Sequence, residues 1–184
     1  RSSRTNVARC TKLPTGSIRY PAGTHVTAVP GFAEGTCWVQ DAAAALPATL
    51  LAARPGESIA DLCAAPGGKT AQLAAAGAVV TAIDRDAARR ARLRENFTRL
   101  KLEVTAIAAD ATLWQPPAPL DAVLLDAPCS ATGIIRRHPD VAYLKRSRDV
   151  EHLVAGQDRL LDAACAMLRP GGRLCMAVWA TVAE

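Results

Sequence analysis

Residues 58–70 constrain the fold of this chain more than any other part of its sequence. A short apolar run, 59–62, leads into a turn that contains Pro66, Gly67 and Gly68, and an alanine-rich segment of helical character follows. A strand that breaks into a glycine turn and a helix presents free backbone N–H groups beside the carboxyl edge of its sheet. This arrangement is typical of a nucleotide-like ligand site in an α/β protein.

The same turn has a competing interpretation as a phosphate-binding loop. Residues 67–70 read Gly-Gly-Lys-Thr, and residues 122–126 could be the Mg²⁺-bearing strand of an NTPase. The first glycine of such a loop should fall at position 63, where Cys63 stands, and Pro66 stiffens the middle. Both features disturb the ring of N–H groups that wraps a triphosphate. No G-x-G-x-x-G dinucleotide fingerprint fits either, so the NTPase is kept only as a less favoured alternative.

The rest of the chain alternates apolar runs with amphipathic segments. Helices are predicted over 41–53, 70–76, 86–100 and 147–168, and strands over 58–62, 79–83, 103–108, 122–125 and 173–178. This alternation predicts an α/β fold with a doubly wound, mostly parallel sheet. Residues 1–38, rich in Thr, Pro and Gly, are expected to be a linker with small β elements, and residues 39–184 the main domain.

Composition narrows the class of protein without identifying it. With 184 residues the chain is long enough for one domain, and no apolar run suits a membrane span or a signal peptide. Its six cysteines show no C-x-x-C spacing, which indicates reduced thiols in the cytoplasm and no metal site. The net charge of +5 suits a polyanionic partner such as RNA.

Four segments, in order along the chain, resemble one enzyme family. They are 32–41 (FAEGTCWVQD), 61–70 (DLCAAPGGKT), 126–133 (DAPCSATG) and 133–140 (GIIRRHPD). These resemble the RsmB/Sun group of S-adenosylmethionine-dependent 16S rRNA (cytosine-C5)-methyltransferases. The resemblance implies a Rossmann-like class I methyltransferase fold, S-adenosylmethionine as cofactor, ribosomal RNA as substrate and methyl transfer to C5 of a cytosine.

The resemblance also assigns cofactor contacts to this sequence. They are Cys63, Ala64, Ala65, Pro66, Gly67, Gly68, Lys69, Asp84, Asp110 and Asp126. Asp84, about 20 residues beyond the glycine turn, is placed to accept hydrogen bonds from ribose hydroxyls, with a helix N-cap as the alternative. Asp110 corresponds to the acidic residue that contacts the adenine amino group, with a loop or cap role as the alternative. Lys69 either neutralises the methionine carboxylate or is a solvated charge.

Chemistry at a cytosine ring gives the second motif its roles. C5 is a poor nucleophile until a thiolate adds to C6, and the addition is easier if N3 is protonated or hydrogen-bonded. Asp126, expected to be buried at a strand end, is the candidate for the N3 contact, and Cys129 is the candidate thiol. The alternative for Cys129 is a small buried hydrophobic residue.

The sequence departs from the family at the end of its last predicted strand. The family carries a second cysteine, the nucleophile, in a T-C-S segment that should fall near position 179, where Trp179 stands. Cys175 lies four strand residues away, roughly 13 Å, and cannot simply replace it. Three explanations are open: a reading-frame change after Leu174, a non-catalytic cofactor- and RNA-binding module, or Cys129 as nucleophile. The last two strands of the family's sheet are also expected to be missing, which would leave an exposed edge.

The partner predictions rest on basic residues and on base accessibility. Arg136 and Arg137 follow the second motif and suit RNA phosphates. The basic residues between 85 and 101 are interpreted as an exposed helix face, and Trp38 as a core residue. A target base must leave its stack to be modified, so single-stranded or loop RNA is the expected substrate. The protein is expected to be a monomer.

Overall fold

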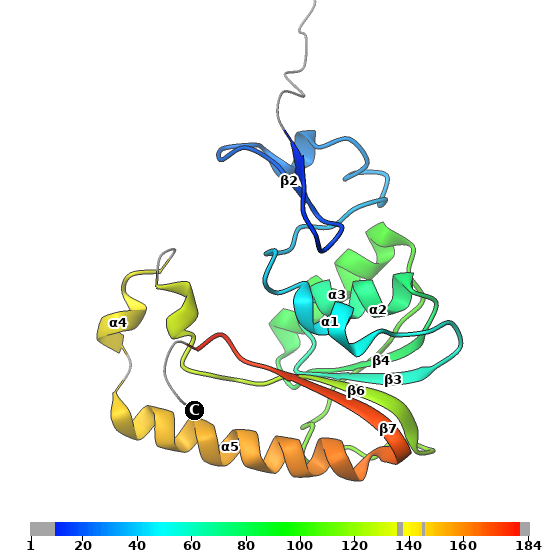
Figure 1. Cartoon of the computed structure of the whole chain (residues 1–184), viewed down its shortest axis with the longest axis vertical. Coiled ribbons are helices and arrows are strands. Elements are labelled where there is room, and N and C mark those ends of the chain that lie inside the picture. Colours follow the sequence, from blue (N-terminus) through cyan, green and yellow to red (C-terminus); the bar gives the residue numbers. More distant parts are fainter. Residues whose placement is uncertain (1–9, 136–137, 145, 181–184) are drawn as a thin grey trace, which may run out of the picture.

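The computed structural model describes residues 10–135, 138–144 and 146–180. Its centre is a five-stranded parallel sheet in the order β5-β4-β3-β6-β7 (Figure 1). The strands are β3 (Ser58–Leu62), β4 (Val79–Ile83), β5 (Thr105–Ile107), β6 (Leu120–Asp126) and β7 (Leu168–Ala177). The predicted α/β, mostly parallel sheet with a Rossmann-like arrangement is thereby confirmed.

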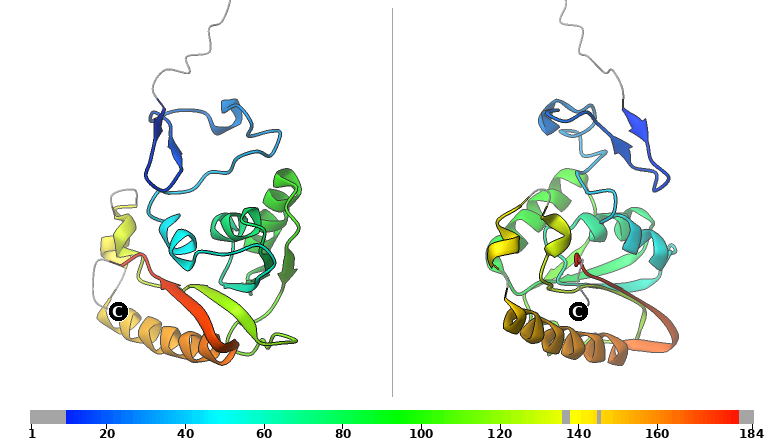
Figure 2. Two further views of the ribbon diagram at one scale, coloured as in Figure 1. Left: turned by 45° about the vertical axis from the view of Figure 1, so that its right-hand side comes forward. Right: turned by 60° about the vertical axis from the view of Figure 1, so that its left-hand side comes forward.

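Helices cover both faces of this sheet. They are α1 (Leu46–Leu51), α2 (Gly68–Ala75), α3 (Ala87–Leu100) and α5 (Ser147–Ala166), with a short α4 (Val141–Leu144) before α5. Figure 2 shows α5 on the face opposite α1, α2 and α3. Side chains alternate across β3 accordingly: Ile59 packs with the α1 and α2 side, and Leu62 with the α5 side. The carboxyl ends of β3, β4 and β6 therefore open between two helical layers.

The central strands agree with the sequence expectations because their apolar runs are short and clearly bounded. The observed limits of β3 and β4 equal the predicted 58–62 and 79–83, while β5 is shorter and β6 longer than expected. Leu62, Leu124 and Leu125 are fully buried, as expected for strands covered on both faces. These strands fix the position of every loop at the carboxyl edge.

Two predicted helices are wrong at their ends. The helix expected over 41–53 is only α1, Leu46–Leu51, because Pro47 lacks an N–H and is tolerated only in a first turn. Asp41 instead accepts a hydrogen bond from the backbone N–H of Ala43 in a preceding turn. The helix expected to reach 168 ends at Ala166. Residues 169–172 lie within β7, at an irregularity in its pairing with β6.

The segment before the sheet forms small, exposed elements. A two-stranded antiparallel pair joins β1 (Thr11–Lys12) to β2 (Ile18–Arg19), and a single 3-10 turn, η1, spans Val26–Ala28. The chain then passes over the end of α3 before α1 begins (Figures 1 and 2). This path brings residues 32–41 next to the β3–α2 loop.

Candidate active site

The loop between β3 and α2 is held by its own backbone. Cys63 and Gly67 both have positive φ, at 61° and 99°. The N–H of Ala64 donates to the Ile83 carbonyl at 3.1 Å, and the N–H of Gly67 donates to the Ala64 carbonyl at 2.8 Å. A Cβ on Gly67 would lie 3.0 Å from Cζ of Phe97, so the turn needs glycine both for its conformation and for its packing against α3.

Two clefts open on either side of this loop. The first, of about 400 Å³, is called here the Asp84 cleft, and its lining includes Cys63, Asp84, Asp110, Pro128 and Arg89. The second, of about 340 Å³, is called the Asp126 cleft, and its lining includes Phe32, Trp38, Gly67, Gly68, Lys69, Asn96, Arg99 and Asp126. The predicted site residues are therefore distributed over two neighbouring clefts that share one loop.

Asp84 lies at the end of β4 with only 4% of its surface exposed. Its carboxylate accepts hydrogen bonds from the backbone N–H groups of Ala65, at 3.1 Å, and Asp86, at 2.9 Å, and lies 3.6 Å from Arg89. Asp86 is the N-cap of α3, so the capping alternative does not apply to Asp84. A carboxylate can accept about four hydrogen bonds, which leaves Asp84 capacity toward the cleft.

Asp110 is exposed at the opposite side of the same cleft. Its Oδ1 accepts hydrogen bonds from the backbone N–H and the hydroxyl of Thr112, at 2.9 and 2.7 Å. The Thr112 hydroxyl is the main reason that the pKa of Asp110 lies below its usual value. Asp110 thus holds its own loop and also lines the cleft, so the adenine contact stays a prediction beside the loop role.

Lys69 and Asp126 form an ion pair in the second cleft, with Nζ 2.7 Å from Oδ2. Lys69 is 8% exposed, so its interpretation as a solvated charge is wrong. The Asp126 side chain is 32% exposed, so the expectation that it is buried is also wrong; it is half-buried and lines the cleft. Because Lys69 is engaged by Asp126, it is not presented as the free phosphate-binding lysine of an NTPase.

Asp61 is a buried carboxyl that sequence reasoning left without a role. It is fully buried within β3 and accepts a 2.5 Å hydrogen bond from the Thr70 hydroxyl, while its Oδ1 has no hydrogen-bond partner among the described residues. Burial raises the pKa of Asp61 to about 7 against the opposing effect of Thr70. The signal available in the sequence was a carboxylate inside an apolar strand, next to the glycine turn.

Cys129 lies in the turn after β6 and is half-buried. The Ala127 N–H extends the pairing with β7, and Gln157 of α5 donates to the Pro128 carbonyl at 2.9 Å, which together fix the turn. The backbone N–H of Trp179 donates to the Cys129 sulfur at 3.2 Å. Trp179, which stands where the family's second cysteine is expected, therefore contacts Cys129 directly.

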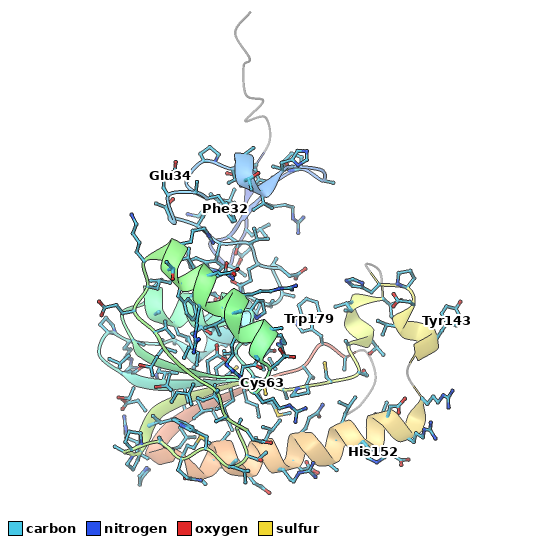
Figure 3. All side chains as sticks on the ribbon, turned by 180° about the vertical axis from the view of Figure 1, so that it is seen from behind. Phe32, Glu34, Cys63, Tyr143, His152 and Trp179 are labelled. Atoms are coloured by element: carbon cyan, nitrogen blue, oxygen red, sulfur yellow. The ribbon has the colours of Figure 1, made fainter. Side chains whose placement is uncertain are left out.

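The other cysteines near the site are positioned differently. Burial raises the pKa of Cys63 to about 12, so its thiol stays protonated. Cys175 pairs with Leu124 inside the sheet, packs against the core, and has its pKa raised by burial. Figure 3 shows Cys63 near the strand ends and Trp179 beyond the end of β7. The expectation that Cys175 cannot replace a cysteine at position 179 agrees with this placement.

Two predicted RNA contacts cannot be placed, and one interpretation changes. Arg136 and Arg137 lie outside the described residues. The basic residues of α3 are more than an exposed face: Arg89 donates to the Ala65 carbonyl, and Arg99 donates to carbonyls of residues before the sheet. Arg89, Asn96 and Arg99 are seven and three residues apart, and residues at such spacings lie on one face of a helix. Their spacing in the sequence could therefore have indicated a polar face of α3.

Comparison with known proteins identifies the family. A family model described as "16S rRNA methyltransferase RsmB/F" matches residues 48–183, about three quarters of the chain. The chain belongs to this family. The RsmB/Sun resemblance of the sequence motifs is thereby confirmed, and the NTPase alternative is not supported.

Individual relatives agree with the family match. The chain is 45% identical over 173 residues to ribosomal RNA small subunit methyltransferase B of Cronobacter sakazakii, covering 91% of the chain and 40% of that protein. It is 50% identical over 154 residues to the protein of the same name from Vibrio cholerae, covering 81% of the chain and 36% of that protein. The chain therefore spans about two fifths of the length of these relatives.

Solved structures support the same fold. The structure of NSun6 from Pyrococcus horikoshii with SFG superposes with a TM-score of 0.76 at 29% identity, covering 84% of this chain and 41% of that one.

Among the described residues, no helix is long and apolar enough to cross a membrane. The same residues contain no cluster of three or more His, Cys, Asp or Glu side chains suited to a metal ion.

Proposed function

We propose that the chain binds S-adenosylmethionine in the Asp84 cleft and methylates C5 of a cytosine in 16S ribosomal RNA. The observation that carries this proposal is the placement of the two clefts on either side of the 63–69 loop. One cleft offers carboxylates for a nucleoside, and the other offers a Lys–Asp pair for a base. The names of the relatives point to the same activity.

The residues of the Asp84 cleft fit the proposed cofactor. Asp84 and Asp110 present carboxylates suited to ribose hydroxyls and to an exocyclic amino group. The first-turn residues Gly68 and Lys69 of α2 line the neighbouring Asp126 cleft, at the other end of the shared loop. When bound, S-adenosylmethionine supplies an electrophilic methyl group; the chain's part is to orient it and to activate the base.

The Asp126 cleft supplies the polar groups that activation of cytosine needs. When the thiolate sulfur of Cys129 adds to C6, a carbon–sulfur bond forms and electron density moves toward N3. The Asp126–Lys69 pair is suited to hydrogen-bond the N3 side of the ring and to stabilise this charge. C5 then becomes nucleophilic and would accept the methyl group as the sulfonium carbon–sulfur bond of the bound cofactor breaks. Removal of the C5 proton by a base and elimination of the Cys129 sulfur as thiolate restore the aromatic ring.

A non-catalytic cofactor- and RNA-binding module is the second candidate. It is favoured by the position of Trp179, whose N–H contacts the Cys129 sulfur at the place where the family carries its nucleophile. RNA containing 5-fluorocytosine separates the two, because fluorine at C5 blocks the elimination and traps the carbon–sulfur adduct. An adduct that forms with S-adenosylmethionine and is lost in Cys129→Ala supports catalysis by Cys129, and its absence from the unmodified protein supports the module.

The proposal extends to the form of the RNA substrate, to its phosphate contacts, and to the state and location of the protein. The substrate is a single-stranded or loop region of RNA, Arg136 and Arg137 contact its phosphates, and the protein acts as a monomer in the cytoplasm without a metal. Support comes from the net charge of +5, which suits a polyanion, and from the general requirement that a base leave its stack before an enzyme can modify it. The test compares the affinity of the protein for a loop RNA with its affinity for the base-paired form of the same sequence. Tighter binding of the paired form would contradict the proposed substrate.

A further inference from the structure

The outer wall of the Asp126 cleft comes from outside the sheet. Residues 32–38, the wall segment, contribute Phe32 and Trp38 to its lining. The opposite side is formed by the loop and by Lys69, which belong to the α/β core. Figure 3 shows Phe32 beside the carboxyl-terminal end of α3. The width of the cleft therefore depends on how this segment is attached to α3.

Arg99 makes most of this attachment. Its Nη1 donates to the carbonyl oxygens of Phe32, at 2.7 Å, and Cys37, at 2.9 Å, so one nitrogen bridges two residues of the wall segment that lie five positions apart. Its guanidinium also lies over the Phe32 ring, 4.1 Å from the centroid, as in a cation–π contact. Arg99 lies on the last turn of α3 and lines the same cleft.

Gly35 completes the contact from the other side. It has a φ of +79°, and a Cβ there would overlap the backbone carbonyl oxygen of Arg99. Gly23 has nearly the same conformation, with a φ of +81°, but no atom of the described residues lies within 4 Å of where its Cβ would be. The two glycines thus differ in packing and share the same backbone requirement, which makes them a matched pair for substitution.

Trp38 is held at the inner end of the wall segment. Its indole N–H donates to Oε1 of Gln40 at 2.9 Å, and Gln40 Nε2 donates to Oε1 of Gln72 in α2 at 2.8 Å. The indole N–H is therefore engaged by a side chain of the protein. The wall is anchored to α3 by Arg99 and to α2 by Gln40.

We propose that Arg99 is a positioning residue that sets the Asp126 cleft for RNA. By holding the wall segment on α3 it keeps Phe32 and Trp38 opposite the Lys69–Asp126 pair, so that an unstacked nucleotide fits between an aromatic wall and a polar floor. Base–aromatic stacking contributes about 1–3 kcal/mol per base. This inference rests on the proposed function, because it assumes that the cleft holds a nucleotide of the substrate.

The test compares RNA affinity with cofactor affinity in the 184-residue chain. Arg99→Ala and Gly35→Ala are expected to weaken binding of a short cytosine-rich single-stranded RNA about tenfold or more, measured by fluorescence anisotropy. Binding of S-adenosylmethionine, measured by calorimetry, is expected to change less than about twofold, because the Asp84 cleft does not include the wall segment. Gly23→Ala is expected to change neither, and Arg99→Lys, which can still reach one carbonyl, is expected to recover part of the RNA affinity.

A loss of RNA affinity without a loss of S-adenosylmethionine affinity distinguishes a positioning role from a general loss of protein stability. Equal losses of RNA and cofactor affinity, or a Gly23→Ala variant that behaves like Gly35→Ala, overturn the inference. A wild-type chain that binds S-adenosylmethionine without binding RNA also overturns it, while the cofactor part of the proposed function stands. A wild-type chain that binds neither ligand contradicts the proposed function as a whole.

Discussion

The ammonium group of Lys69 lies 2.7 Å from the carboxylate of Asp126, and the two side chains differ in their exposure to solvent. The Lys69 side chain is 10% exposed and that of Asp126 is 32% exposed. The pair joins the first turn of α2 to the end of β6, across the floor of one cleft. A buried charge that loses its partner is costly, whereas a solvated one is much less so.

This asymmetry predicts unequal effects of removing the two partners. Asp126→Ala leaves the more buried Lys69 unpaired and is expected to lower the free energy of unfolding by about 3 kcal/mol. Lys69→Met leaves the better-solvated Asp126 and is expected to cost about 1 kcal/mol. Urea denaturation of both variants and of the double variant checks this, and equal losses in the two single variants would contradict the exposure argument. Both variants are expected to lose methyl transfer.

The Asp84 cleft gives a prediction about cofactor affinity. Asp84→Ala removes a carboxylate that faces the cleft and orders the loop, so calorimetry is expected to show at least about tenfold weaker binding of S-adenosylmethionine. Asp110→Ala, at an exposed position on the other side, is expected to weaken binding less. Asp162, exposed on α5 and outside both cleft linings, is the matched control. Unchanged affinity in Asp84→Ala, with an intact thermal transition, would remove this residue from the site.

The sequence predicted the core of the fold because its signals there are local. β3 and β4 are apolar runs bounded by turn residues, and the glycine turn between β3 and α2 marks the site. Helix ends were predicted poorly where one residue overrode a favourable composition, as Pro47 does in the alanine-rich run before β3. The average composition of a stretch of residues does not reveal the effect of one proline that lacks its backbone N–H.

Pairwise contacts across the fold could not be predicted in the same way. The Lys69–Asp126 pair joins residues 57 positions apart, and Arg99 reaches carbonyl oxygens 62 and 67 positions away. Such contacts depend on sheet order and helix placement, which no local pattern contains. The motif resemblance named Asp126 and Lys69 separately, and only the fold shows that each determines the environment of the other.

Asp61 gives a prediction about pH. Because its pKa rises from 3.8 to about 7 on folding, the folded state binds the proton more tightly than the unfolded chain. Its contribution to stability is complete below about pH 4 and is lost as the pH rises toward 7. The stability of the wild type relative to Asp61→Asn is therefore expected to fall by a few kcal/mol across that window, measured by urea denaturation at several pH values.

Thr70 provides the control for this pH dependence. Its hydroxyl donates to Asp61 and lowers the pKa of that carboxyl against the effect of burial. Thr70→Val is therefore expected to move the upper end of the window to higher pH. A stability difference between wild type and Asp61→Asn that is constant from pH 4 to 7 would show that Asp61 does not take up a proton on folding.

Gly67 connects the stability of the fold to the geometry of the loop between β3 and α2. Gly67→Ala meets two obstacles, a φ of 99° and a Cβ 3.0 Å from the Phe97 ring. Gly56→Ala meets a φ of 81°, and within the described part of the chain no atom lies within 4 Å of its Cβ. The left-handed conformation costs an alanine about 1–2 kcal/mol at either position, and overpacking adds about 1–3 kcal/mol at Gly67 alone. Denaturation curves are expected to separate the two variants by this second amount.

The overpacking at Gly67 is expected to depend on Phe97, which packs under the loop from α3. In a Phe97→Leu background the ring carbons nearest to the new methyl group are gone, so Gly67→Ala should cost less than it does in the wild type. An equal cost in both backgrounds would assign the whole effect to backbone conformation. A reduced cost, accompanied by recovery of S-adenosylmethionine binding, would show that α3 sets the shape of the loop to which both clefts belong.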